Sequence, residues 1–521
     1  MTIISQPNVT VNIIAANADV SNTPQKVLFV GQMLAAGSAT ERTLIENIGN
    51  SKSDINALFG AGSMIAEMIL QAREINELVQ FDAIPLDDNV TAVQKTLDIS
   101  FTGAFTVAGT VQVVLGSERK YTIESSILAG DTTTEVAAKV SGAINLIDCP
   151  FSATPSLGVV EIEAKNGGEI ANSIGVKAVI DGCAGLDVGL VNPVVGANDP
   201  SLIAVLDPVI GNRYQTIVWP YVDDVSEVVD FLDDRFNIDN DVLDGIAITT
   251  FVDTYSNLIT AGNALNSKSL VVIGDVVETV DVTQSVKIAP AILEIPYAVS
   301  SQIAAIRSLR LTDGASISQY VISRAGALDS FGGAALASKP YFNTPLALLP
   351  TIDTGEGFSK TEIENLFDSG IMVLGNNISK TGVLMGEAVT TYKTDPASNP
   401  DVSFKFMNYV DTASGAREYF FNNLKSRFAQ SRLTEGDLIA GREMANAELI
   451  AAVCTGLYSD LSGADFVLLQ AGEDALKFFK QNLVVTLDLD VGQATIQMKV
   501  PLVTQLRTII ATMQIAFSTT G

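Results

Sequence analysis

The pattern of hydrophobic and polar residues has a period of two near both ends of the chain. This period is typical of a β-strand with one buried face. Chain ends fray unless something holds them. The pattern therefore predicts two terminal arms, residues 1–24 and 504–521, that pair with the chain's own core or with neighbouring copies. The positions expected on the buried face of the arms are Val9, Val11, Ile13, Met513, Ile515 and Phe517.

Between the arms, much of the chain alternates between helical and strand patterns, which predicts a parallel-type α/β core. Its first part, residues 25–95, contains an apolar run at 26–31, a helix that begins after Ser63 and a second strand at 79–85. The alternation resumes in residues 199–357. There we expect helices at 202–209, 225–236 and 254–265, and strands at 216–220, 245–250 and 270–274.

Residues 96–198 differ from both of these parts. They read as short alternating strands interrupted by glycines, with one helix at about 133–144, which predicts a mostly-β module inserted in the core. Residues 358–503 predict a C-terminal domain with several helices and two final strands, 483–488 and 495–500. The predicted fold class is therefore a multidomain mixture of α/β and α+β, with an inserted β module and extended arms.

The composition is that of a folded, strongly acidic protein. Of 521 residues 47% are hydrophobic and 17% are charged, and acidic residues outnumber basic ones 59 to 31, which gives a net charge of −28. Such a charge repels nucleic acid and anionic membranes as a whole. The sequence shows neither a secretory signal nor an uncharged apolar run of about 18 residues. We therefore expect no direct binding to nucleic acid and no insertion into a membrane.

The chain contains no histidine. This excludes Ser-His-Asp and Cys-His relays, a histidine general base and histidine-ligated metals. Chemistry based on carboxylate, lysine or tyrosine stays open, so the absence only lowers the expectation of an enzyme. Cys149, Cys183 and Cys454 lack CxxC spacing, and we expect buried free thiols, with a Cys149–Cys183 disulfide as the alternative. No catalytic residue, cofactor or metal site is predicted.

One segment is basic. Residues 419–433 carry Lys425, Arg427 and Arg432 and no acidic residue. Helical spacing places Lys425 and Arg432 on one face and Arg427 elsewhere, with Phe421, Leu424 and Phe428 toward a core. The segment is either an ordinary solvated helix or an electrostatic dock for an acidic partner surface.

The order of several segments resembles the tail sheath proteins of Mu-like contractile-tailed phages. The segments that carry the resemblance are KVLFVG, ALFGAGSMIAEMI, FDAIPLDD, TIVWPYVD, FSKTEIENLFDSGIMVL, AVTTYKTDPASNPDVSF and VPLVTQLRTIIATMQIAF. The resemblance covers nearly the whole chain, and the inserted β module is its least specific part.

The resemblance implies a non-enzymatic structural subunit of a contractile phage tail sheath. Such a subunit polymerises helically around the inner tail tube protein, meets baseplate and tail-terminator or neck proteins, and contracts to deliver the genome through the host envelope. It would be assembled in the bacterial cytoplasm and reside in the virion. The part of the α/β core at residues 199–357 would be subtilisin-like in shape only, because no histidine is present.

The resemblance also implies roles for individual residues. Both arms would add strands to a small sheet in the C-terminal domain of neighbouring copies, and the strands at 483–488 and 495–500 would receive them. Residues 17–24 and the chain around Pro501 would act as hinges. Lys425, Arg427 and Arg432 are the candidates for docking to the tube. Two alternatives remain: a non-contractile shell or surface-layer polymer, and an α/β enzyme that uses carboxylates.

Overall fold

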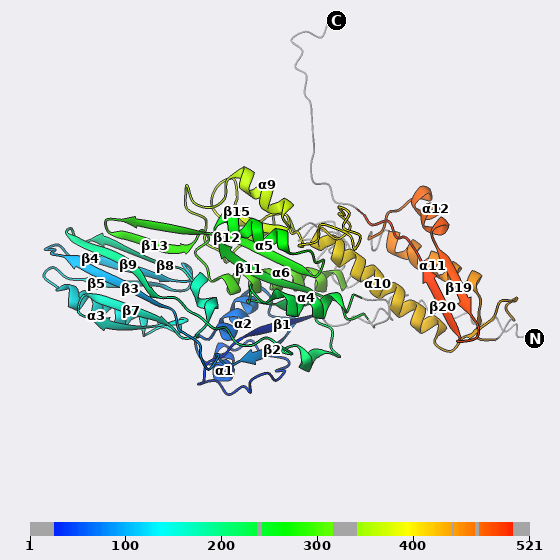
Figure 1. Ribbon diagram of the computed structural model, residues 1–521, viewed down its shortest axis with the longest axis horizontal. Helices are drawn as coiled ribbons and strands as arrows, with labels where there is room; N and C mark the ends of the chain where they lie inside the picture. Colours follow the sequence, from blue (N-terminus) through cyan, green and yellow to red (C-terminus); the bar gives the residue numbers. More distant parts are fainter. Residues whose placement is uncertain (1–24, 237–241, 316–340, 440–441, 464–467, 504–521) are drawn as a thin grey trace, which may run out of the picture. The chain divides into compact units, whose positions relative to one another are not determined.

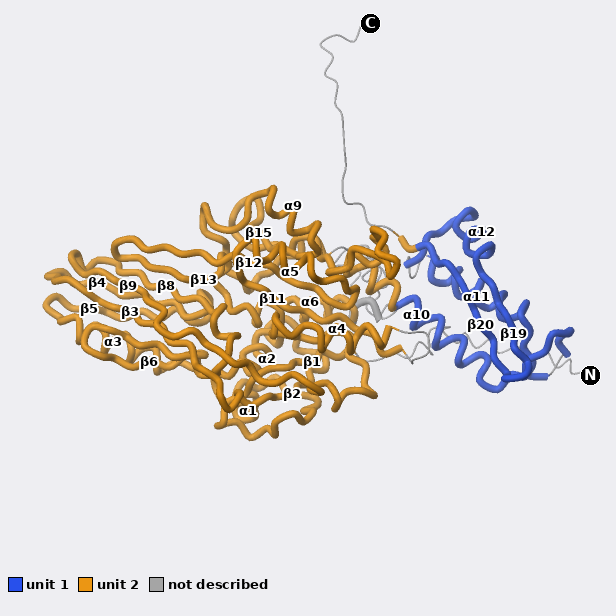
Figure 2. Tube along the Cα trace, viewed as in Figure 1, with its two compact units in different colours: residues 1–24, 415–501 blue, residues 25–414, 502–521 orange. Residues whose placement is uncertain are grey.

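The computed structural model describes residues 25–236, 242–315, 341–439, 442–463 and 468–503. Its chain forms two compact units, shown in different colours in Figure 2. The first, which we call the core unit, contains Gln25–Ser414, and the second, the C-terminal unit, contains Gly415–Pro501. The predicted fold class, a mixed α/β multidomain protein, is confirmed at this level.

The core unit is built on a sheet of 12 described strands (Figure 1). The parallel part runs in the order β2 (Gln80–Leu86), β1 (Lys26–Gln32), β10 (Thr216–Val218), β11 (Ile246–Asp253) and β12 (Leu270–Val282). Six of the seven residues of β1 are buried. Near-continuous apolar runs of this kind form strands that are covered on both faces.

Helices cover this parallel part of the sheet. The helix α2 packs against α6 and β1, and α4 and α5 pack against β11. Three shorter strands extend the sheet beside β12. The helices are α1 (Lys52–Phe59), α2 (Met64–Ile75), α4 (Val225–Asp233), α5 (Tyr255–Ala264), α6 (Pro296–Ala315) and α9 (Lys360–Asp368), and the strands are β14 (Pro345–Leu346), β15 (Ile371–Asn376) and β16 (Val383–Met385).

Local sequence signals explain where several helices begin. The Ser63 hydroxyl accepts a hydrogen bond from the Ala66 amide at 3.3 Å, which confirms the predicted cap of α2. Ser359 and Glu362 form a capping box at the start of α9. The predicted helix at 202–209 is wrong: the segment forms turns and a short 3₁₀ helix, Asp207–Val209. Ala204 has a φ of 57°, which is incompatible with a right-handed helix.

Residues 96–194 form two layers of strands with one helix, α3 (Thr133–Ile144). One layer is a separate sheet in the order β6-β7-β3-β9, and the other, β8-β4-β5, joins the large sheet through β13. We call this part, together with β13, the β module. Its strands are β3 (Thr96–Gly103), β4 (Gly109–Leu115), β5 (Thr122–Ile127), β6 (Phe151–Ser156), β7 (Val159–Ala164), β8 (Val176–Gly182), β9 (Leu186–Val194) and β13 (Ser285–Pro290).

The strand β12 therefore belongs to both parts of the core unit. Its first half pairs in parallel with β11, and its second half pairs antiparallel with β13. The sequence analysis predicted only the first half of β12 and did not predict β13. The predicted domain limits themselves stay a prediction, because the compact units show where internal contacts are dense and not which segments fold independently.

The C-terminal unit contains the last part of α10 (Met407–Phe428), the helices α11 (Ala447–Ser462) and α12 (Glu473–Gln481), and two small pairs of strands. Its core is aromatic: the rings of Tyr458 and Phe479 stack with centroids 4.3 Å apart, and Phe420 lies 6.4 Å from Phe479. The Tyr458 hydroxyl donates to the Gln470 carbonyl at 2.6 Å. The polar end of this buried ring is thus satisfied, as buried tyrosines require.

In the core unit, a buried ion pair joins α6 to the first part of α10. The Arg307 guanidinium donates to an Asp411 carboxylate oxygen at 2.5 Å, and the Tyr341 hydroxyl donates to the other oxygen at 2.7 Å. The Arg307 and Asp411 side chains are 4% and 0% exposed. Removing one partner of such a pair leaves an uncompensated buried charge.

We expect Asp411→Ala to lower the free energy of unfolding by about 3–5 kcal/mol, because Arg307 would stay buried without its carboxylate. Urea denaturation of the unassembled protein measures this change. The matched control is Glu364→Ala, which breaks the Lys360–Glu364 pair on the surface of α9, whose side chains are 91% and 64% exposed. Exposed pairs contribute little, so the control should unfold as the wild type does. Equal denaturation midpoints for the two variants would contradict the prediction.

Candidate functional site

The C-terminal unit ends in a hairpin of two short strands, β19 (Val484–Asp488) and β20 (Gln493–Gln497). These are the two strands predicted at 483–488 and 495–500, and their presence is confirmed. They pair antiparallel, with Val485 opposite Ile496 and Leu487 opposite Ala494. These four residues are half-buried and alternate with exposed ones, so the hairpin has one face toward α11 and one toward solvent.

Among the described residues, neither outer edge of this hairpin has a strand partner. An edge strand presents a row of free N–H and C=O groups that can pair with another strand. An isolated two-stranded hairpin is only marginally stable in water. The hairpin therefore offers two open edges to added strands. The predicted arm residues, Val9, Val11, Ile13, Met513, Ile515 and Phe517, lie outside the described residues, and so does the hinge at 17–24.

The predicted tube-docking residues lie on two different elements. Lys425 and Arg427 are exposed in the last turn of α10, which ends at Phe428. Arg432 is exposed on the short strand β17 (Arg432–Leu433), which pairs with β18 (Met444–Ala445). The expectation that Lys425 and Arg432 share a helical face is therefore wrong, because the helix stops before Arg432.

The buried face of this part of α10 also differs from the expectation. The fully buried residues are Ala416 and Phe420, whereas Phe421, Leu424 and Phe428 are only half-buried. The Lys425 ammonium group lies 5.0 Å from the centre of the Phe421 ring, a cation–π contact. The role of the three cations in docking stays a prediction.

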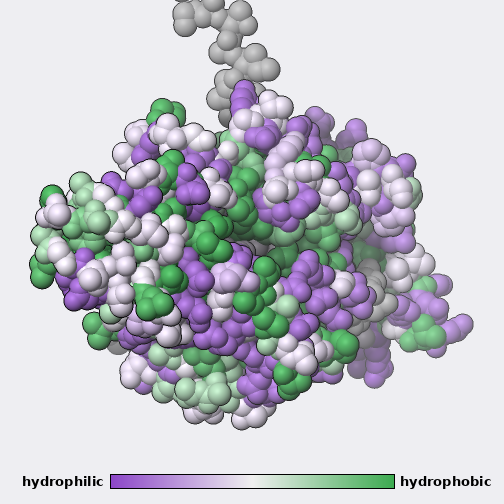
Figure 3. All heavy atoms as spheres, turned by 60° about the vertical axis from the view of Figure 1, so that its left-hand side comes forward, coloured by the Kyte–Doolittle hydropathy of each residue, from purple (hydrophilic) through white to green (hydrophobic). Residues whose placement is uncertain are grey.

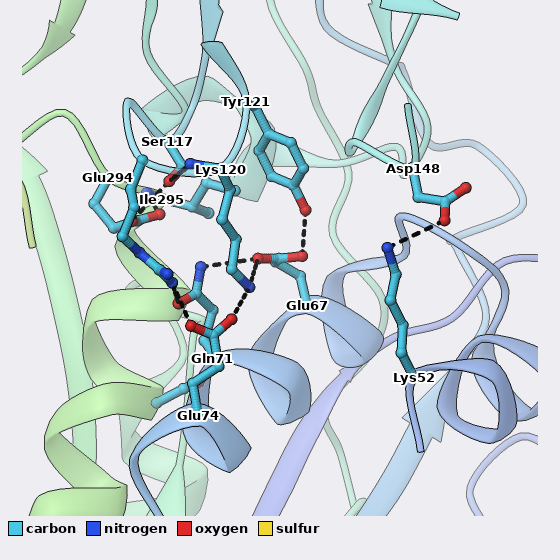
Figure 4. Close-up of polar contacts among 12 residues, drawn as sticks. Lys52, Glu67, Gln71, Glu74, Ser117, Lys120, Tyr121, Asp148, Glu294 and Ile295 are labelled. Atoms are coloured by element: carbon cyan, nitrogen blue, oxygen red, sulfur yellow. Dashed lines mark hydrogen bonds and ion pairs between the residues drawn. The ribbon is translucent and has the colours of Figure 1, made fainter. Parts of the chain in front are cut away.

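A charged cleft of about 420 Å³ lies in the core unit, between α1 and α2 on one side and the β module on the other (Figure 4). Its lining comprises Asn50, Lys52, Asn56, Gly62, Glu67, Leu70, Arg73, Glu74, Glu77, Lys120, Tyr121 and Asp148. Across its mouth, the Lys52 ammonium group lies 3.3 Å from an Asp148 oxygen. The sequence analysis did not identify this cleft.

The Glu67 carboxylate is the centre of the polar contacts in the cleft. It is 2% exposed and accepts hydrogen bonds from the Tyr121 hydroxyl at 2.5 Å, the Lys120 ammonium at 3.1 Å and the Gln71 amide at 3.0 Å. Lys120 also contacts Glu74 at 3.0 Å, and Arg119 contacts Glu74 at 2.6 Å. Burial, and next the charge of Glu67, raise the pKa of Tyr121, which therefore remains a hydrogen-bond donor.

These contacts attach a loop of the β module to α2 of the core. The donors come from residues 119–121, between β4 and β5, and the acceptors follow one side of α2 at positions 67, 71 and 74. That i, i+4, i+7 spacing of Glu67, Gln71 and Glu74 was the available sequence signal. Carboxylates thus hold Tyr121 and Lys120 in place, and the arrangement joins two elements of the core unit.

Neither a metal-binding cluster nor a membrane-spanning helix is found among the described residues. The described residues contain no group of three or more His, Cys, Asp or Glu side chains that could hold a metal ion. In the same described ranges, no helix has the length and apolar character needed to cross a membrane. Cys149, Cys183 and Cys454 are buried free thiols, so the alternative Cys149–Cys183 disulfide is not formed.

Glu294 lies behind the cleft and is buried, with 1% of its surface exposed. One carboxylate oxygen accepts from the Ser117 hydroxyl at 2.8 Å and the other from the Ile295 amide at 3.0 Å. Burial raises the pKa of Glu294 to about 8 in spite of these two hydrogen bonds. The charged groups that act on it include Glu67, which also raises the pKa, and Lys120, which lowers it.

Comparison with known proteins finds similarity to a phage tail sheath protein. This chain is similar to the Mu-like prophage FluMu tail sheath protein of Haemophilus influenzae, with 26% identity over 206 residues. The match covers 39% of this chain and 41% of that relative, so the chain matches about two fifths of the relative's length. The resemblance to the tail sheath proteins of Mu-like phages, expected from the sequence, is confirmed. No family model matches the chain.

Two solved structures are also similar to this chain. A sheath tail protein from Listeria innocua has a TM-score of 0.46 and 12% identity, with 92% of each chain covered. A sheath tail protein from Desulfitobacterium hafniense has a TM-score of 0.43 and 10% identity, with 96% of this chain and 99% of that chain covered.

The raised pKa of Glu294 predicts that the stability of the folded protein depends on pH. A carboxyl group whose pKa is raised from 4.5 to about 8 in the folded state contributes stability below pH 4.5 that is lost as the pH rises toward 8. Glu294→Gln keeps the shape of the side chain but cannot ionise. We therefore expect the difference in melting temperature, variant minus wild type, to increase as the pH rises from 5 to 9. If the difference between the two melting temperatures stays constant from pH 5 to pH 9, Glu294 does not titrate as inferred.

Proposed function

We propose that this chain is a structural, non-enzymatic subunit of a contractile phage tail sheath and a component of the virion. The similarity to a Mu-like prophage tail sheath protein supports the sheath role. The observation that carries the assembly mechanism is the hairpin β19–β20, whose two outer edges have no partner among the described residues. A subunit that polymerises by strand addition needs such open edges.

In this mechanism, the N-terminal arm of one copy and the C-terminal arm of another add strands to the hairpin of a third copy. The main-chain hydrogen bonds hold the arm, and alternate side chains such as Val9, Val11 and Ile13 set its register. Each hydrogen bond contributes about 0.5–1.5 kcal/mol net, so one arm alone binds modestly. A polymer in which every copy gives two arms and receives two is held by many such contacts.

Repeated head-to-tail contacts produce an open helix rather than a closed ring. We propose that this helix surrounds the inner tail tube, contacts baseplate and tail-terminator or neck proteins at its ends, and contracts to drive the tube through the host envelope. Assembly takes place in the host cytoplasm. The hinges at 17–24 and around Pro501 keep the exchanged strands connected while the folded units move.

The contact with the inner tube is assigned to the last turn of α10 and to β17. Lys425, Arg427 and Arg432 are exposed there, in a segment that contains no acidic residue although the chain carries a net charge of −28. Cationic side chains at such a place suit an acidic tube surface and guide its approach.

Electron microscopy of the purified full chain tests the sheath role. Hollow helical tubes are expected, and deletion of residues 1–16, or of everything after Thr508, should leave a folded protein that forms no tubes, because one of the two strand contacts is missing. Circular dichroism and thermal unfolding check that the truncated chains fold. Globular particles alone under all conditions, or tubes from both truncated chains, would refute the mechanism.

The proposed contact with the inner tube is tested separately by charge reversal. Reversing Lys425 and Arg427 together to glutamate should reduce the number of sheathed tubes by at least tenfold when the chain is co-expressed with the inner tube protein, because like charges would then face each other. Arg432→Glu tests the strand β17 independently. The control reverses Lys360 and Lys380, two exposed lysines of the core unit, with the same change in net charge. If sheathed tubes form equally well in all variants, the tube contact lies elsewhere.

A further inference from the structure

The core unit buries two carboxyl groups near the place where β12 changes partners. On the surface, hydrophobic and hydrophilic residues are intermixed, as the face drawn in Figure 3 shows, and such mixing is normal for a soluble protein. Buried polar groups are the more informative feature. Asp275 and Glu294 are 8% and 1% exposed. A buried carboxyl group is stable only when a cation, hydrogen bonds or a proton compensate its charge.

Both carboxyl groups line one narrow cavity. It lies between β11, β12, β15, the connection from β13 to α6 and the first turn of α6. Apart from Asp275, Glu294 and Thr250, the residues that line it are apolar. The space open to the centre of a water molecule is about 10 Å³. A site of this size has room for one water molecule.

Each carboxyl group uses only part of its hydrogen-bonding capacity. Asp275 accepts from two backbone amides, and Glu294 accepts from one backbone amide and the Ser117 hydroxyl, at distances between 2.8 and 3.0 Å. Each oxygen thus accepts one hydrogen bond, although it can accept two. A proton on either group adds a donor that needs an acceptor. One water molecule in the cavity can accept from one carboxyl group and donate to the other.

The charges that face Asp275 do not neutralise it. Within the described ranges of the chain, Asp275 forms no ion pair. Lys287 of β13 acts on it electrostatically, but the Lys287 ammonium group lies 2.5 Å from a carboxylate oxygen of Glu356. Burial has the largest effect and raises the pKa of Asp275 to about 7.

Glu294 is in the same situation, and among the described residues it too lacks an ion pair. Glu67 of α2 repels its charge, and Lys120 of the β4–β5 loop attracts it, but Lys120 lies 3.1 Å from Glu67. Tyr297 of α6 is uncharged, because burial raises its pKa well above 10. Burial again has the largest effect and raises the pKa of Glu294 to about 8.

We propose that Asp275 and Glu294 form a proton-controlled joint between the β module and the parallel part of the large sheet. While each carboxyl group holds its proton, both bind one buried water molecule, and β12, β13 and α6 stay packed around the cavity. When the two protons pass to the solvent, two negative charges share a cavity that cannot solvate them. Water then enters, and the junction of β12 and β13 with α6 opens. The inference concerns the single subunit and does not depend on the proposed polymer.

Linkage gives the direction of the pH effect. The folded state raises both pKa values from their usual 3.8 and 4.5. The two groups therefore stabilise the closed joint fully below about pH 4, and this contribution is lost as the pH rises through about 7 and 8. Because both groups face one cavity, ionisation of one opposes ionisation of the other, and the two titrations are coupled.

Hydrogen exchange of the unassembled full chain, measured by mass spectrometry, tests the joint. The double variant Asp275→Asn/Glu294→Gln cannot ionise at the cavity, and comparison at equal pH corrects for the intrinsic exchange rate. From pH 6 to pH 8, exchange of residues 289–296 in wild type relative to this variant should increase by about tenfold or more, because one pKa unit corresponds to tenfold in the opening equilibrium. The same ratio for β1 should stay constant. The control Asp281→Asn/Glu161→Gln removes two exposed carboxylates and should exchange as wild type does.

A single variant tests whether the two groups share one site. In the Asp275→Asn chain, the pH at which Glu294 titrates, followed through the melting temperature, should lie about one pH unit lower than in wild type, because no neighbouring charge opposes its ionisation. An unshifted midpoint, or an exchange ratio that stays constant with pH, overturns the inference. If the double variant does not fold, exchange of residues 289–296 relative to β1 in wild type replaces that ratio: an increase with pH supports the joint, and a constant value overturns it.

Discussion

The hydrogen bonding of β12 is the interaction on which the core unit depends. The first half of this strand pairs with β11 on one edge and β15 on the other, and its second half pairs with β13, which continues into β8 of the β module. The change of partner takes place between Gly274, the last residue of β12 that pairs with β15, and Val277, the first that pairs with β13. A Cβ atom at Gly274 would lie 2.7 Å from Cγ2 of Ile371 in β15, so any larger residue here would force Ile371 to shift.

Asp275 accepts backbone hydrogen bonds at the place where β12 changes partners. Its two carboxylate oxygens accept hydrogen bonds from the amides of Val276 at 2.8 Å and Ile292 at 3.0 Å. Burial raises the pKa of Asp275 to about 7. The carboxyl group thus satisfies backbone donors that the bend would otherwise leave unpaired. Together with the contacts of Glu67 to the β4–β5 loop, this joins the β module to the rest of the core unit at two places.

Elements that depend on residues close together in the sequence were predicted correctly. Elements that depend on pairing between distant segments were missed. The strand at 26–31, the caps at Ser63 and Ser359 and the final hairpin were predicted because periodicity and capping residues lie within a few positions of one another. The strand β13 was missed because its residues, SVKIAP, form a strand only between β12 and β8. Arg432 was misplaced because neither glycine nor proline follows Phe428 to mark the end of α10. The charged cleft needs two segments about 50 residues apart, and no periodicity joins them.

The edge strand β2 of the core unit and the C-terminal hairpin differ in how far their edges are covered. In the core unit, the edge strand β2 is partly covered by the segment around Ile45, which pairs with Ala83, so that edge does not invite further strands. In the part of the chain that the structure describes, the hairpin β19–β20 has no partner at either edge and only half buries its inner face. One edge of the largest sheet is thus covered, whereas both edges of the hairpin are available to an added strand among the described residues. In the proposed sheath, folded units joined by added strands can change their relative positions while every subunit keeps its fold, as contraction would require.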